Sequence, residues 1–261
     1  MFKVADGDDE LIEFAFAEPE ALEFFVYGAD HPLDITRHYY EDTAYPVLPA
    51  PWALGPWVWR DENEDQAQVE NDVRLIRELD LATVGYWIDR PYASGVNSFD
   101  FSPAMFDDPQ SMIDQMHDAG LLVALWHTPY VGEEQEATAE FHAQAEANGY
   151  YPPVHGLVAN NWGRVVDFTN PDAFDWWQGL IRRYTDMGIE GFKLDYAEDI
   201  VLGLGFGSRS PWNFADGSDE RTMHSRYQLL YERVYAETLP EDGGFLLCRG
   251  GTQGSQVYGP I

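Results

Sequence analysis

The feature that most constrains this chain is an alternation of short apolar runs with longer, helix-patterned segments between residues 52 and 250. Residues 65–80 show the helical pattern, with apolar side chains spaced by four, three and three residues at Val69, Val73, Ile76 and Leu79. The apolar runs are apolar almost throughout, as strands are when both faces of a parallel sheet are covered. We therefore predict βαβ units. The predicted strands are residues 52–60, 82–89, 121–127, 191–195 and 244–250.

Two of the predicted helices carry matching start and stop signals. Asp108 and Asn170 each place a capping residue before a proline at the first helical position. Gly120 and Gly188 follow the ends of these helices, where glycine is common. A fourth helix is predicted over residues 220–237, so that helices fill the intervals between the strands.

Two architectures fit this order, a doubly wound sheet and a (β/α)8 TIM barrel. No glycine-rich phosphate turn follows the first strand, which disfavours a dinucleotide-binding sheet. Every predicted strand instead ends in polar or aromatic residues, and a barrel would gather these ends into one site on one face. The predicted fold is therefore a barrel with about five βα units present. The strand ends are Trp59-Arg60, Asp89-Arg90, Trp126-His127, Asp195 and Arg249.

The first fifty residues differ from the rest and are predicted to be a separate unit. Two strands, Leu11 to Ala17 and Leu22 to Tyr27, flank a Glu-Pro turn. A short helix is expected over residues 34–43, followed by a proline-rich connector at residues 46–51. The predicted domains are residues 1–50 and the barrel region at residues 51–261.

The net charge of -31 comes from 46 acidic and 15 basic residues, of which only Lys3 and Lys193 are lysines. Such a surface repels nucleic acid and anionic membranes, so neither is expected as a partner. Salt would screen the self-repulsion, and we interpret the charge as adaptation to a salty cytoplasm, as in halophiles. An ordinary acidic surface remains the alternative. The single Cys248 and an N-terminus without a signal-like segment favour a cytoplasmic protein.

Tryptophans and carboxylates at one rim suggest sugar binding, because indole faces stack on pyranose rings and carboxylates accept hydrogen bonds from hydroxyls. Asp195 is the strongest candidate for a glycosidase nucleophile. Lys193 lies two residues earlier on the same strand face, where it would favour the ionised carboxylate. The alternative is that Asp195 only caps the next segment. The histidines show no metal-binding spacing, so neither a metal nor a cofactor is predicted.

Six segments in this order resemble glycoside hydrolase family 31, which includes α-glucosidases and α-xylosidases. They are "PAPWALGPWVWR", "WIDRPY", "LLVALWHTPYV", "VVDFTNPDAFDWW", "GFKLDYAED" and "LLCRGGTQGSQ". The resemblance covers nearly the whole chain and implies a TIM barrel preceded by the end of an N-terminal β-sandwich. It also implies a retaining, double-displacement hydrolase that acts on α-linked glucosides or xylosides, with an oligosaccharide or glycoside as its substrate.

The resemblance assigns roles to individual residues. Asp195 occupies the nucleophile position, and Glu198 fits the glutamate that follows the nucleophile by three. Lys193 is similar to the lysine of the α-xylosidase-like branch, where many α-glucosidases have tryptophan. The residues that would hold the sugar in the cleavage subsite are Asp89, Trp126 and Arg249.

The family's acid/base aspartate lies in a Trp-x-Gly-Asp type segment that this sequence does not contain. We therefore expect a family member cut at both ends, inactive as this polypeptide alone. Two alternatives stay open: an α-galactosidase-like hydrolase of a related barrel family, and a sugar-binding remnant without catalysis. Homo-oligomerisation of a full-length protein is also left open.

Overall fold

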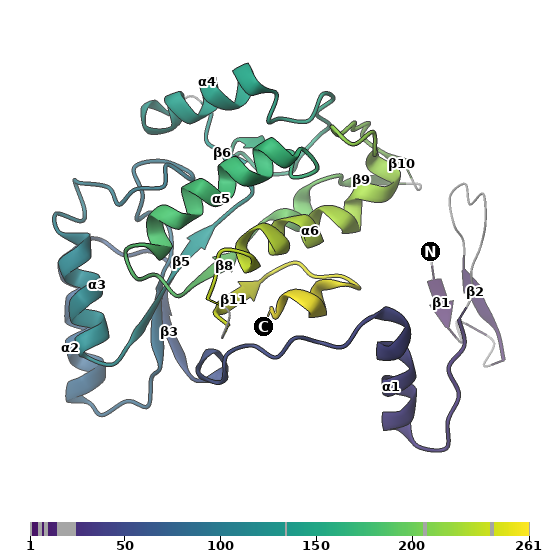
Figure 1. Cartoon of the computed structure of the whole chain (residues 1–261), viewed down its shortest axis with the longest axis horizontal. Helices are drawn as coiled ribbons and strands as arrows, with labels where there is room; N and C mark the ends of the chain where they lie inside the picture. Colours follow the sequence, from purple (N-terminus) through teal and green to yellow (C-terminus); the bar gives the residue numbers. More distant parts are fainter. Residues whose placement is uncertain are drawn as a thin grey trace.

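A five-stranded parallel sheet forms the centre of the molecule (Figure 1). The computed structural model describes residues 2–4, 7, 10–14, 25–133, 135–205, 208–240 and 243–260. The sheet order β11-β8-β5-β4-β3 is simply the chain order, without the reversal that marks a doubly wound sheet. The sequential order identifies the barrel architecture and decides between the two candidates. The strands are β3 (Trp57–Arg60), β4 (Gly85–Ile88), β5 (Leu122–His127), β8 (Gly191–Leu194) and β11 (Phe245–Cys248).

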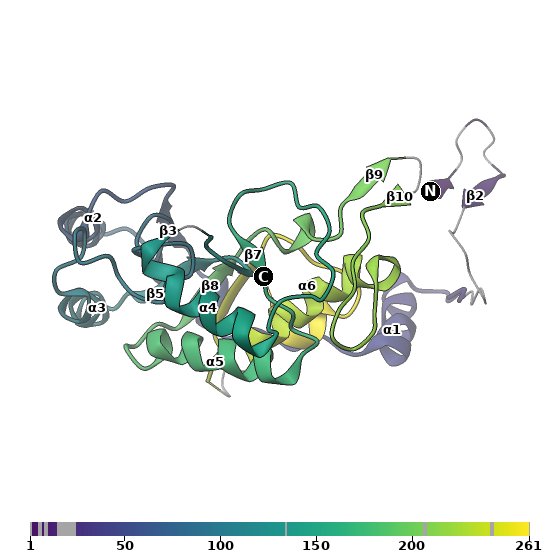
Figure 2. The same ribbon diagram turned by 90° about the horizontal axis from the view of Figure 1, so that it is seen from above.

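The four predicted helices between these strands are confirmed. Asp65, Asp108, Asn170 and Asp219 each cap a helix by accepting a hydrogen bond from a backbone N–H of its first turn. Figures 1 and 2 show the helices packed along one face of the sheet, where they bury the main core around Phe192, Trp177 and Tyr235. The helices are α2 (Gln66–Glu78), α3 (Pro109–Asp118), α5 (Pro171–Thr185) and α6 (Glu220–Ala236).

The opposite face of the sheet is the concave interior of the partial barrel. Trp57 of β3 and Phe245 of β11 come from the two outermost strands, yet their rings stack with centroids 4.0 Å apart. Trp87 of β4 lies against the same phenyl ring, with 6.3 Å between centroids. The sheet is therefore strongly curved, and large aromatic side chains fill the bottom of its interior.

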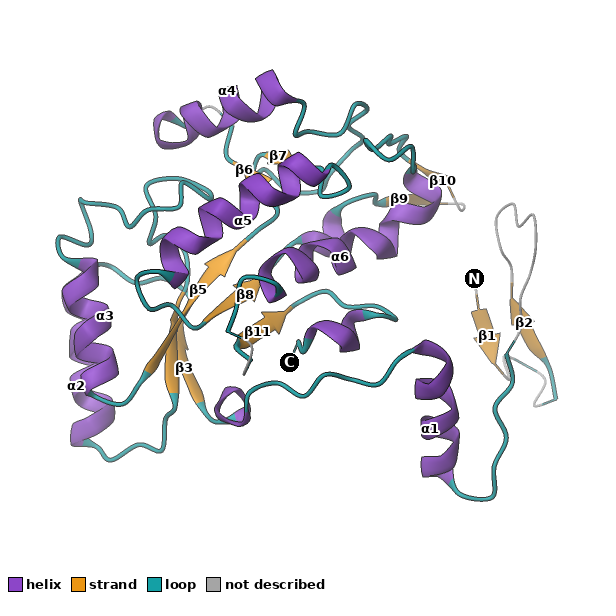
Figure 3. Ribbon diagram, viewed as in Figure 1, coloured by secondary structure: helices purple, strands orange, loops and turns teal. Residues whose placement is uncertain are grey.

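Further short elements connect these units (Figure 3). They are η1 (Pro51–Leu54), β6 (Tyr130–Val131), η2 (Glu136–Thr138), α4 (Ala139–Asn148), β7 (Arg164–Val165), η3 (Ala197–Asp199), β9 (Gly203–Gly205), β10 (Ser208–Arg209) and η4 (Ser255–Tyr258).

The first predicted strand was too long. Residues 52–60 were expected to be extended throughout, but η1 occupies the first part and β3 begins only at Trp57. Pro51 at the start of η1 presets a helical φ and needs no N–H partner, whereas Pro56 cannot donate to a sheet ladder. The two prolines therefore favour a turn before the strand.

The N-terminal part contains β1 (Phe2–Val4) paired antiparallel with β2 (Ile12–Phe14), and then α1 (Pro32–Thr43). The helix expected at residues 34–43 is confirmed. Of the two predicted strands, β2 lies within the first and residues 15–17 lie outside the described part. The second is wrong at residues 25–27, which have no regular structure, and residues 22–24 lie outside the described part. Figure 1 shows α1, β1 and β2 apart from the barrel.

No helix in the described part of the chain has the length and apolar character needed to cross a membrane.

Candidate active site

Period-two alternation places the predicted residues on the interior face of the sheet. Side chains two residues apart in a strand share a face, so Lys193 points the same way as Asp195, and Trp87 the same way as Asp89. Trp126 of β5 is in register with Lys193 of β8, which pairs in turn with Leu247 of β11, two residues before Arg249. The structure thus brings together at one rim the residues Asp89, Trp126, Lys193, Asp195, Glu198 and Arg249.

Asp195 is buried, with 5 % of its surface exposed, and donors surround its carboxylate. The indole Nε1 of Trp126 donates to Oδ2 at 2.9 Å, and the Lys193 ammonium pairs with the same oxygen. Arg249 Nε lies 2.9 Å from Oδ1, which also accepts from the backbone N–H of Tyr196 at 3.2 Å. Two cations and two neutral donors therefore fix the orientation of this buried group.

Arg249 connects Asp195 to Glu198. Its Nε also pairs with Glu198 Oε1, and its guanidinium carbon lies 3.9 Å from the centroid of the Tyr196 ring. Burial alone would lower the pKa of Arg249, but the charges of Asp195 and Glu198 outweigh it and raise that pKa. Glu198 thus acts here as a support for the arginine.

Asp89 lies at the same rim between two tryptophans. Its Oδ2 accepts from Trp59 Nε1 at 2.7 Å and from Trp87 Nε1 at 3.1 Å. Burial raises the pKa of Asp89, while these indole hydrogen bonds and the charge of Lys193 oppose the rise. Asp89 can accept hydrogen bonds from sugar hydroxyl groups in this position.

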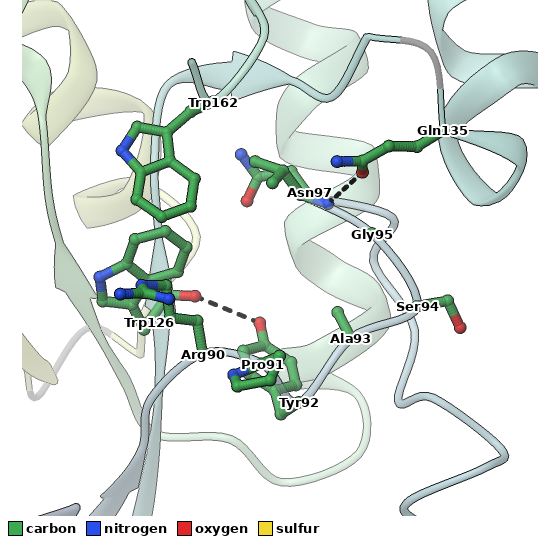
Figure 4. Close-up of a pocket in the computed structure, with 11 residues that line it drawn as sticks. Arg90, Pro91, Tyr92, Ala93, Ser94, Gly95, Asn97, Trp126, Gln135 and Trp162 are labelled. Carbon is green, nitrogen blue, oxygen red and sulfur yellow. Dashed lines mark hydrogen bonds between the residues drawn. The ribbon is translucent and has the colours of Figure 1, made fainter. Parts of the chain in front are cut away.

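A cavity of about 420 Å³ lies beside Trp126 (Figure 4). The indole rings of Trp126 and Trp162 form one wall, with their centroids 5.2 Å apart in an edge-to-face arrangement. Asn97 and Gln135 stand on the opposite side in the same view. Its volume is in the range of about 300–1,000 Å³ that is usual for small-molecule sites.

Sequence reasoning placed Trp59 at a converging strand end without giving it a role, and it missed Trp87 and Trp162. Trp87 could have been found, because it lies on the interior face by simple alternation. Trp162 comes from a loop whose sequence carries no such signal. Its place depends on Asn160, whose Oδ1 accepts from the Trp162 N–H at 3.1 Å and whose Nδ2 donates to Tyr130 Oη at 2.9 Å.

Two residues at predicted strand ends do not belong to the rim. Arg60 pairs with Asp72 of α2 on the helix side of the sheet. His127 is fully buried among helices, its Nδ1 lies 2.7 Å from the Tyr235 hydroxyl, and burial lowers its pKa to about 3. Each residue follows a tryptophan of the interior face by one position, so the pleat directs it to the other face.

Within the described residues, no group of three or more His, Cys, Asp or Glu side chains is arranged to hold a metal ion. The expectation that the protein needs neither metal nor cofactor stays a prediction.

A parallel barrel sheet with clustered carboxylates, cations and tryptophans at its carboxyl rim defines a TIM-barrel protein with a candidate carbohydrate site. The chain belongs to glycoside hydrolase family 31, since the model described as "Glycosyl hydrolases family 31 TIM-barrel domain" matches residues 46–261.

Curated relatives agree with this assignment. An α-xylosidase of Emericella nidulans is 29 % identical over 255 residues, which cover 92 % of this chain and 31 % of that protein. "Alpha-glucosidase 2" of Bacillus thermoamyloliquefaciens is 27 % identical and covers 95 % of this chain and 33 % of its own length. The chain therefore spans about a third of the curated relatives it matches.

Solved structures share the fold. A family 31 dextranase of Flavobacterium johnsoniae with bound glucose superposes with a TM-score of 0.78 at 20 % identity, covering 89 % of this chain and 30 % of that one. A family 31 α-xylosidase from a soil metagenome, solved with xylose, gives 0.71 at 22 % identity, with coverages of 89 % and 35 %.

Proposed function

We propose that this chain is the catalytic-barrel part of a retaining α-glycoside hydrolase in which Asp195 is the nucleophile. The observation that carries the proposal is the convergence of Trp126, Lys193 and Arg249 on one buried carboxylate. These contacts fix the orientation of the carboxylate, as attack on an anomeric carbon requires.

In the first step an Asp195 oxygen forms a bond to the anomeric carbon as the bond to the leaving-group oxygen breaks. In the second step water attacks the same carbon, and Asp195 is released as a carboxylate, which retains the anomeric configuration. Asp89 would bind hydroxyls of the sugar, and the face of the Trp126 indole would pack against the sugar ring. The acid/base residue is not assigned to any residue of this chain.

The substrate we propose is an α-linked xyloside or glucoside. Relatives from Emericella nidulans and Lactiplantibacillus pentosus are named α-xylosidases, and another relative is named an α-glucosidase. Lys193 supports the xyloside, because its ammonium reaches the interior rim from the position that the α-xylosidase-like branch also gives to lysine.

Covalent labelling tests the nucleophile. A fluorinated α-xylosyl fluoride needs little protonation of its leaving group, so trapping does not depend on the acid residue. Peptide mass spectrometry should find the sugar on Asp195, with no label on Asp195→Asn and an unchanged label on Asp199→Asn. A label on Glu198 or Asp199 would overturn the assignment.

A further inference from the structure

The cavity beside Trp126 is lined by a basic residue, although most charged residues of this chain are acidic. Among the eleven described residues that line it, Arg90 is the only one with a charged side chain. The chain has 46 acidic residues against 15 basic ones, so a randomly chosen charged lining residue would be acidic about three times in four. The formal charge in the described lining of this cavity is therefore the single positive charge of Arg90.

Carboxylates near the cavity are already committed to other partners. Asp89 accepts from Trp59, from Trp87 and from the backbone N–H of Arg90 itself. Asp100 accepts from the backbone N–H of Ser94 and from the Ser98 hydroxyl. Neither is placed to neutralise the Arg90 guanidinium.

Glu62 is the counter-ion of Arg90, and it is a weak one. Its Oε1 lies 3.6 Å from Arg90 Nη1, and the side chains are 63 % and 40 % exposed, respectively. Exposed ion pairs of this kind contribute little stability. The guanidinium can therefore exchange Glu62 for a ligand carboxylate, to which its planar fork can donate two hydrogen bonds.

The remaining lining suits a sugar ring. Trp126 and Trp162 offer aromatic surface on one side, and Arg90 itself lies over the Trp162 ring at 5.1 Å. Asn97 uses its Nδ2 for Thr128 and Tyr130, which leaves its amide oxygen as an acceptor within the described part of the chain. Gln135 uses its Oε1 for the Val96 N–H, and its amide nitrogen has no partner among the residues that the structure describes, so it can donate to a ligand.

Trp126 joins the cavity to the nucleophile. Its ring forms part of the cavity wall, while its Nε1 donates to Asp195. A sugar unit in the cavity would therefore be the neighbour of the unit held at Asp195.

We propose that this cavity receives a sugar unit that carries a carboxylate, and that Arg90 selects it. The inference rests on the proposed function, because that unit would be the leaving group of the proposed reaction. The substrate class is then an α-glycoside linked to an acidic sugar.

Binding of glucuronic acid and glucose to the 261-residue chain tests the selection, measured by quenching of tryptophan fluorescence at one fixed salt concentration that keeps every variant folded. Glucuronic acid should bind about tenfold more tightly than glucose, the factor expected for one charge-assisted pair. Arg90→Gln should remove this preference by weakening the binding of glucuronic acid about tenfold. Glu62→Gln should increase it by about threefold, because the competing carboxylate is gone.

Arg209→Gln is the matched control, since it removes the same charge from the exposed strand β10 and should keep the preference. Equal affinity for the two sugars, no measurable binding of either at tens of millimolar, or a preference that survives Arg90→Gln would overturn the inference.

The proposal that Asp195 is the nucleophile and the proposal that Arg90 selects an acidic sugar can be refuted independently. Asp195→Asn abolishes labelling but should keep the preference for glucuronic acid. A preference that depends on Arg90 together with a label elsewhere refutes only the nucleophile. A label on Asp195 with no preference refutes only the acidic sugar.

Discussion

The carboxylates buried in this protein differ in what surrounds them. Asp195 is paired with two cations, whereas the partners of Asp167 among the described residues are neutral donors, including the Thr169 hydroxyl and the backbone N–H of Ala215. Glu232 of α6 accepts only from the Ser255 hydroxyl among the described residues, at 2.9 Å. Asp195 therefore differs from these two carboxylates, and also from the buried Asp72, which pairs with the single cation Arg60.

Glu232 should make stability depend on pH. It is 1 % exposed, and burial raises its pKa to about 7, with the Ser255 hydrogen bond opposing the rise. The folded state thus favours the protonated acid, whereas the pKa of this carboxyl in the unfolded chain is about 4.3. The protonated Glu232 therefore contributes its full stabilisation below the unfolded-state pKa. This contribution is lost as the pH rises through the folded-state pKa of about 7.

Glu232→Gln removes this dependence, because the amide cannot ionise. We expect the variant to gain stability relative to the parent as the pH rises from 5 to 8, up to about 3 kcal/mol. Urea unfolding of both proteins at a series of pH values measures the difference. A constant difference across the series would contradict the prediction, and Ser255→Ala, which keeps the carboxyl, should still show the pH dependence.

At the scale of the helix, local capping signals have direct counterparts in the structure. The Asp108 carboxylate accepts from the Ser111 N–H at 3.0 Å, and the Asn170 amide oxygen accepts from the Asp172 N–H at 3.0 Å. Each cap satisfies a donor that the helix itself leaves without a partner. The N-termini of these two helices are therefore determined by only a few neighbouring residues.

Asp108→Ala should lower the free energy of unfolding by about 1 kcal/mol, the usual cost of losing an N-cap. Asp107→Ala is the matched control, since it removes the same charge from the exposed position next to the cap. Denaturant unfolding of both variants checks the prediction. Equal destabilisation would show that charge, and not the cap, is responsible.

At the scale of the whole molecule, the charge of -31 should set the salt requirement. Thermal unfolding should show a midpoint that continues to rise well past the salt range in which simple screening saturates. A variant with about ten exposed Asp and Glu changed to Asn and Gln should need less salt. A midpoint that is flat between low and high salt would refute the halophilic interpretation. The cytoplasmic location, the domain boundary at residue 50 and the oligomeric state stay predictions.

Tested by itself, the 261-residue polypeptide should hydrolyse an unactivated α-disaccharide very poorly. In the described part of the chain β3 and β11 are the edges of an open sheet, and no residue is assigned as the acid. Loss of general acid catalysis lowers the rate by about 10²–10⁴-fold, and the open barrel should lower it further. Activated aryl α-glycosides are the control substrates, since their leaving groups need little protonation. Turnover of the disaccharide at an ordinary enzymatic rate would mean that a carboxylate of this chain serves as the acid.

The sequence by itself determined the βα units, the helix starts and the convergence of Asp89, Trp126, Asp195 and Arg249 at the rim. These features follow from short-range periods and caps, and parallel strand ends must converge once the units form. The tertiary structure decided the rest. Only the order of the strands excluded the doubly wound sheet, and only the packing of the helices placed His127 against Tyr235. Trp162 and Arg90 meet Trp126 through loops, whose positions depend on long-range contacts such as that of Asn160 with Tyr130. Such contacts between distant residues do not follow any sequence period, so they could not be predicted.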